Sequence, residues 1–90
     1  MRTIIKSHRF EVELRHIRRD AKAADEFVEA AEWALARRVN IGTQVAIDPP
    51  VWFLPIADTE RVAPVILYYT FDEVSVYFLS IQRAPAPSLN

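Results

Sequence analysis

The chain has 90 residues, of which 51% are hydrophobic, and its 11 basic and 12 acidic side chains leave a formal net charge of −1. This length suits one domain with a modest core, and the high apolar fraction excludes a disordered chain. The absence of cysteine excludes a disulfide framework and any thiolate metal site, and the near-neutral charge argues against nucleic-acid binding. No segment predicts a signal peptide or a membrane span, so a cytoplasmic protein is expected.

The charges are unevenly distributed along the chain. Residues 1–20 hold six basic and three acidic side chains, whereas residues 41–80 hold one basic and five acidic side chains. A solvated helix surface explains the basic front of the chain most simply. The alternative is a basic stripe that meets phosphate or an acidic partner.

Residues 3–6 contain two β-branched apolar residues and predict a short first strand. Ser7 is then suited to cap a helix. Three apolar residues follow at helical spacing: Phe10, Leu14 and Ile17. Residues 9–15 also fit a strand, because apolar and charged side chains alternate there. We favour the helix, since Ile17 extends the helical pattern.

A second helix is predicted from Ala21 to Arg38, a segment rich in alanine and free of glycine and proline. Asp20 is a candidate N-cap, while Asn40 and Gly42, the only glycine, offer a C-terminal stop. One apolar stripe runs along this helix: Ala24, Phe27, Val28, Ala31, Ala34 and Leu35.

Trp33 lies off the apolar stripe of the second helix. Packing sideways under the first helix is the simpler explanation for this residue. The alternative is contact with a partner chain, because tryptophan is enriched at protein interfaces.

The rest of the chain predicts strands at 44–47, 51–56, 65–70 and 74–81, with Asp72 and Glu73 in the last turn. Residues 84–90 are expected to form a flexible proline-rich tail after a single domain spanning 1–83. Both faces of the last two strands carry apolar residues. One face must pack on the helices, and the other would remain semi-apolar and open, which often marks an interaction site.

The predicted fold is α+β, with a short N-terminal strand and a two-helix hairpin packed on a three- to four-stranded antiparallel sheet. This order resembles the RelE/ParE superfamily of bacterial type II toxins over about residues 3–82. The resemblance is carried by Ser7–Leu14, by the long helix from Ala23 to Arg37, and by the strand–turn–strand segment Val65–Ile81.

The resemblance implies the toxin of a type II toxin–antitoxin system, RelE-like, which would inhibit translation as a ribosome-dependent mRNA endoribonuclease. The alternatives are a ParE-like toxin that binds DNA gyrase, and a non-toxic interaction module on the same fold. The expected partners are a cognate antitoxin and a cellular target. The target is the ribosome with its mRNA for a RelE-like toxin and DNA gyrase for a ParE-like toxin. A second copy of the chain is another candidate to cover the open face, and no membrane partner is expected.

The chemistry of RNA cleavage needs a general base, a general acid and cations for the phosphate. The candidate catalytic residues are Arg61, Arg83 and Tyr77, although a surface position for the two arginines and a structural role in the sheet for Tyr77 are the simpler explanations. The candidate partner-binding residues are Trp33, Trp52 and Tyr68. The two histidines, His8 and His16, are too far apart to share a metal, so neither metal nor cofactor is expected.

Overall fold

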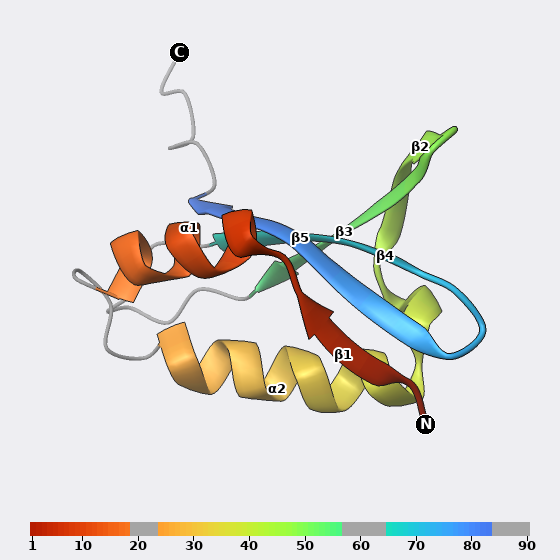
Figure 1. Ribbon diagram of the computed structural model, residues 1–90, viewed down its shortest axis with the longest axis horizontal. Coiled ribbons are helices and arrows are strands. Elements are labelled where there is room, and N and C mark those ends of the chain that lie inside the picture. The colour runs from red at the N-terminus through yellow and green to blue at the C-terminus, as the bar shows by residue number, and fades with distance from the viewer. Residues whose placement is uncertain (19–23, 57–64, 84–90) are drawn as a thin grey trace, which may run out of the picture.

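Two helices pack on one face of a five-stranded sheet in the computed structural model, which describes residues 1–18, 24–56 and 65–83 (Figure 1). In chain order the elements are β1 Thr3–Lys6, α1 His8–Arg18, α2 Ala24–Arg37, the 3₁₀ helix η1 Val39–Ile41, β2 Thr43–Ile47, β3 Pro50–Ile56, β4 Val65–Phe71 and β5 Ser75–Arg83. The predicted α+β class, with two helices on a sheet, is confirmed.

The sheet is larger than predicted, and it is mixed. Its strand order is β1-β5-β4-β3-β2, with five strands where three or four were expected. The pairs β2–β3, β3–β4 and β4–β5 are antiparallel, but β1 runs parallel to β5, with Thr3 opposite Ser75. A fully antiparallel sheet was therefore a wrong prediction. The partner of β1 lies near the other end of the chain, where no local periodicity identifies it.

Helix α1 confirms the helical alternative for residues 9–15. The Ser7 hydroxyl caps it as predicted, because its Oγ accepts a hydrogen bond from the Phe10 N–H at 3.0 Å. The same Oγ donates to the Leu79 carbonyl at 3.0 Å, which fixes the start of α1 beside β5. Phe10 is fully buried, with its ring centroid 5.3 Å from that of Phe78.

Helix α2 begins at Ala24 and ends at Arg37, inside the predicted range. Asp20, the expected N-cap, lies outside the described residues. Acidic residues occupy the first turn and Arg37 the last, which suits the helix dipole. Of the predicted apolar stripe, Phe27 and Ala34 remain partly exposed, and the other four residues are buried.

Gly42 does not act as the expected helix stop. Helix α2 ends five residues earlier, η1 intervenes, and the Gly42 φ of −81° is open to any residue. This position requires glycine because there is no room for a side chain. A Cβ added at Gly42 would lie 2.5 Å from the Phe53 carbonyl oxygen and 2.5 Å from the Tyr69 hydroxyl, closer than real Cβ contacts.

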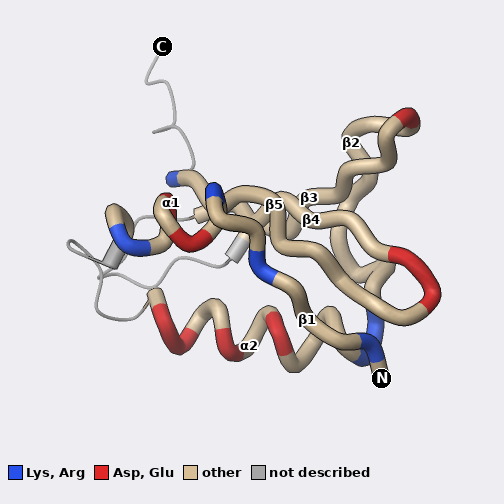
Figure 2. The backbone as a smooth tube through the Cα atoms, viewed as in Figure 1, with Lys and Arg blue, Asp and Glu red and all other residues tan. Residues whose placement is uncertain are grey.

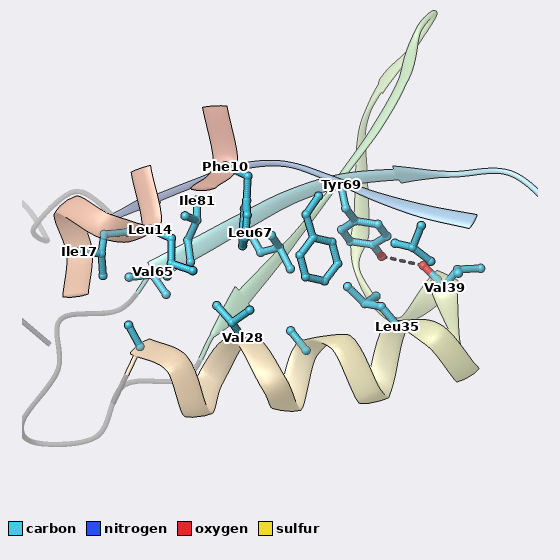
Figure 3. Packing of buried hydrophobic residues seen from close by; sticks show 14 residues of the cluster. Phe10, Leu14, Ile17, Val28, Leu35, Val39, Val65, Leu67, Tyr69 and Ile81 are labelled. Atoms are coloured by element: carbon cyan, nitrogen blue, oxygen red, sulfur yellow. Dashed lines mark hydrogen bonds between the residues drawn. The ribbon is translucent and has the colours of Figure 1, made fainter. Parts of the chain in front are cut away.

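The Tyr69 hydroxyl occupies the centre of this crowded region. It donates to the Val39 carbonyl at 2.6 Å and accepts from the Gly42 N–H at 3.1 Å. Tyr69 is fully buried, and this burial raises the pKa of its hydroxyl. Figure 3 shows the side chain reaching from the sheet toward η1 within the hydrophobic core. One side chain thus ties β4 to the segment that joins α2 to β2.

We expect Tyr69→Phe to lower the free energy of unfolding by about 1 to 3 kcal/mol, because it leaves two backbone groups without a partner. Urea denaturation followed by circular dichroism measures this loss. Tyr68→Phe is the matched control, since no hydrogen bond joins the Tyr68 hydroxyl to a described residue. Equal stability of the two variants would contradict the role given to Tyr69.

Candidate binding face

The sheet has an open face on the side away from the core. Val65, Leu67 and Tyr69 of β4 are buried, and the residues between them point to the other side and are partly exposed. Residues directly opposite in the register share a face. The open face is defined here by six residues of β3, β4 and β5: Val51, Phe53, Ile66, Tyr68, Tyr77 and Leu79.

The open face is mainly aliphatic and aromatic, and Thr70 and Gln82, which lie opposite Tyr77 and Ile66, add polar groups to it. None of its six residues carries a charge at neutral pH, and all six are partly exposed. Tyr68 lies at its centre, opposite Phe53 on one neighbouring strand and Ser80 on the other. The sequence analysis predicted a semi-apolar open face, and these partly exposed residues form it.

A β-bulge shapes one side of the open face. The register between β4 and β5 shifts so that Tyr68 pairs with Ser80 and Tyr69 with Phe78, which leaves Leu79 as the extra residue. Strand β1 pairs only with residues 75–78 of β5. The remaining part of β5 therefore has room for α1 beside it, and Figure 1 shows α1 next to this end of the strand.

A pocket of about 290 Å³ lies where α1 meets the open face. Its lining residues come from α1, β3, β4 and β5: Arg9, Val51, Tyr68, Leu79, Ser80 and Gln82. A chain of side-chain hydrogen bonds runs along it. Gln82 Nε2 donates to Ser80 Oγ at 3.1 Å, and Ser80 Oγ donates to Glu13 Oε1 at 2.7 Å. Arg9 Nε donates to the same Glu13 oxygen at 3.3 Å.

This pocket is better suited to binding than to proton transfer. The Glu13 carboxylate already accepts from a buried hydroxyl and a guanidinium, so its charge is compensated. The Arg9 side chain is 70% exposed and could still contact an anion or a polar group of a partner. Tyr68 could stack on an aromatic group or a base beside it.

The candidate catalytic residues are not gathered in one place. Tyr77 and Arg83 lie toward opposite ends of β5, roughly 20 Å apart at strand spacing. The Tyr77 hydroxyl donates to Asp72 Oδ2 at 3.0 Å, so it helps to hold the β4–β5 turn. Arg61 lies outside the described residues. Tyr77 and Arg83 therefore do not form a common site.

The candidate partner-binding residues occupy three different environments. Tyr68 lies on the open face, whereas Trp52 packs inward, with its ring centroid 5.5 Å from that of Phe71. Trp33 is 64% exposed on α2, where the Arg37 guanidinium stacks over its ring at 4.2 Å. The prediction that Trp33 packs under the first helix was wrong, because its place on the helical wheel points it to solvent.

Arg9, Ser80 and Gln82 were not selected as site residues from the sequence. The alternation of the last strand predicts opposite faces for Leu79 and Ser80, and only the bulge places both beside Tyr68. The position of α1 beside β5 is likewise a tertiary contact. The alternation within 65–70 sorted the strand residues into two faces and predicted that one of them would remain open, and the structure shows that it is the face that carries Tyr68.

Asp72 replaces glycine in the β4–β5 turn. Its Oδ1 accepts from the Val74 N–H at 2.9 Å and from the Ser75 N–H at 2.8 Å. These two backbone hydrogen bonds, followed by the one from the Tyr77 hydroxyl, hold the pKa of Asp72 below its usual value. The carboxylate thus fastens the turn that connects β4 to β5, the two strands of the longest pairing in the sheet.

We expect acid to remove the stabilisation that Asp72 supplies. Because its folded-state pKa lies below the unfolded value of roughly 4, this stabilisation is complete above that pH and disappears as the pH falls through the folded pKa. Asp72→Asn should lower the melting temperature at pH 7 and lower it much less at pH 2.5. Thermal unfolding at the two pH values checks this, and an equal loss at both would contradict it.

The described residues contain no metal site, and comparison with known proteins does not identify a function for the open face. No group of three or more histidine, aspartate or glutamate side chains is suitably placed for a metal in the described part of the chain. Within residues 1–18, 24–56 and 65–83, no helix is long and apolar enough to cross a membrane. No protein-family model matches the sequence, and no curated protein is significantly similar to it.

Proposed function

We propose that this chain is the toxin of a bacterial type II toxin–antitoxin pair and that it acts by binding a protein target through the open face. The observation that carries this proposal is the uncharged, partly exposed face centred on Tyr68. A folded domain rarely leaves a contiguous apolar surface without a partner. The order of a strand, two helices and a run of strands supports the resemblance to RelE/ParE toxins.

A ParE-like mode of action fits these residues better than RNA cleavage. Binding to a protein such as DNA gyrase needs an apolar patch with aromatic anchors and a polar rim. The open face supplies the patch, and the pocket beside Arg9 supplies part of the rim. Cleavage would need a free base, a free acid and several cations, whereas Glu13 is engaged and Tyr77 binds the turn.

A second candidate, ribosome-dependent mRNA cleavage, rests on the same pocket. Arg9 would contact a phosphate, and Tyr68 would stack on a base beside it. The cognate antitoxin would cover the open face in either case and keep it from its target. Experiment can separate the two modes of action. Binding to gyrase would cause DNA damage while protein synthesis continues, whereas mRNA cleavage would stop protein synthesis.

We expect induced expression in a bacterial host to arrest growth and to switch on a DNA-damage reporter while protein synthesis continues. Tyr68→Glu should abolish the arrest, because it places a charge at the centre of the open face. Ile47→Glu is the matched control, since Ile47 is 85% exposed on β2 and lies outside the open face. Growth curves, the reporter and pulse-labelled protein synthesis give the readouts.

Other outcomes identify the alternatives. Loss of protein synthesis together with mRNA cut in ribosome-bound codons would replace the ParE-like proposal with the ribonuclease. Normal growth of cells that accumulate the folded chain would leave only a non-toxic interaction module on this fold.

A further inference from the structure

We propose that α2 binds α2 of a second copy of this chain, so that the two helices lie antiparallel across a two-fold axis. The contact lies on the helix side of the sheet, and it goes beyond the function proposed for the open face. Three observations carry the inference: a highly exposed tryptophan, a small residue one turn before it, and opposite charges at the two ends of one helix surface.

The solvent side of α2 carries residues at the spacing of a helix pair. Residues with alternating separations of four and three form a seam along one side of a helix, which a second helix can cover. Four exposed residues have this spacing and are called the α2 seam below: Glu26, Ala30, Trp33 and Arg37. Their exposure shows that no described element of the same chain covers the seam.

Trp33 is the apolar anchor of the α2 seam. It is 64% exposed, and no other aromatic side chain among the described residues is as exposed. The Arg37 guanidinium stacks over its ring at 4.2 Å, and Arg37 Nη1 donates to the Trp33 carbonyl at 2.9 Å. The indole ring is therefore already held by its own helix and loses little conformational freedom when a partner binds, which favours its use as an anchor.

The antiparallel register matches unlike residues at every level of the seam. A two-fold axis that crosses α2 between positions 31 and 32 places Trp33 of one copy opposite Ala30 of the other. The small Ala30 side chain leaves room there for the indole ring. The same register places Glu26 opposite Arg37, and each of these contacts occurs twice.

The charge pattern of the helix selects both the partner and the orientation. Acidic residues lie in the first turn of α2 and Arg37 lies in the last, and Figure 2 shows red segments along the helix with blue at its end. A parallel pair would set Glu26 against Glu26, which is unfavourable. A uniformly basic or acidic partner would match only one end of the seam. A second copy of α2 in antiparallel orientation matches both ends.

An apolar pocket beside the seam widens the contact. It has a volume of about 200 Å³ and is lined by Phe27, Ala30, Ala31, Ala34, Leu54 and Pro55. Phe27 and Ala34 belong to the predicted apolar stripe of α2 but remain partly exposed. The two-fold axis keeps the same flank of both helices on one side of the pair, so the two pockets border the seam together. Water leaves additional apolar surface as a result.

The contact is nevertheless small. A helix of 14 residues is about 21 Å long and roughly 10 Å wide, so the helix pair alone buries less than a stable, specific interface does. We therefore expect a dissociation constant on the order of 100 μM.

Sedimentation velocity of the full chain between 10 μM and 1 mM tests the dimer. Glu26→Arg and Arg37→Glu should each weaken association by about tenfold, because each leaves like charges at both ends of the seam. A chain that carries both changes should dimerise again, since the exchange restores opposite charges. A chain that stays monomeric at 1 mM, or a double variant that does not recover, would overturn the proposal.

Mixing the two single variants gives a sharper test of the register. In a mixed pair every arginine meets a glutamate, so Glu26→Arg chains and Arg37→Glu chains should associate with one another at least tenfold more tightly than either does with itself. Glu73→Arg is the matched control, since Glu73 lies on the β4–β5 turn outside the α2 seam, and it should dimerise like the unchanged chain. Equal association in mixed and unmixed samples would overturn the antiparallel register.

Trp33→Ser tests the anchor and should remain a monomer at 1 mM. Circular dichroism verifies that this variant and the charge variants are folded, which the exposure of all the changed side chains favours. A Trp33→Ser chain that dimerises normally would overturn the role given to the seam.

The dimer can be separated from the toxin because the helices cover one side of the sheet and the open face is the other side (Figure 1). Tyr68→Glu should therefore dimerise like the unchanged chain, and loss of its dimer would overturn this inference. A chain that dimerises without affecting growth would support this inference and remove the proposed function. A chain that arrests growth but stays monomeric at 1 mM would overturn this inference and support the proposed function.

Discussion

The structure depends on a close approach between three parts of the chain, which meet around the Tyr69 hydroxyl. Gly42 is near enough to Phe53 and Tyr69 that no side chain fits there. The hydroxyl fills the remaining space and satisfies one donor and one acceptor of the backbone between α2 and β2. A polar atom at the centre of an apolar core is tolerated because both of its hydrogen bonds are made. The position of the β2–β3 hairpin relative to the helices follows from this contact.

The bulge at Leu79 has the corresponding role on the other side of the sheet. It places Leu79 and Ser80 together opposite Tyr68, so an apolar group joins the open face while a hydroxyl reaches toward α1. Ser80 is buried, and Glu13 of α1 meets its hydroxyl with a charge-assisted hydrogen bond. The same irregularity therefore anchors α1 and shapes the pocket at the rim of the open face.

Local patterns were sufficient for much of the fold. The spacing of Phe10 and Leu14 identified the buried side of α1, and the Ser7 cap was correctly placed. The alternation in Val65–Phe71 separated the two faces of β4, and the structure shows which of them is open. The partner of β1, the bulge and the contact of Glu13 with Ser80 depend on residues distant in the chain, and no periodicity encodes them. Gly42 was predicted to end the second helix through its backbone conformation. Its conformation is ordinary, and glycine is needed there because its surroundings are crowded.

The parallel pairing of β1 with β5 has a consequence for the order in which the protein can fold. During synthesis β1 leaves the ribosome well before residues 75–78, which belong to the only described strand that it pairs with. Until then Ile4 cannot bury its side chain against the core, and the α1 cap at Ser7 lacks its acceptor on Leu79. Such long-range contacts slow folding, because loop closure must precede any gain from pairing. The nascent chain thus holds an incomplete sheet until β5 appears, and β1 becomes fully structured only together with β5.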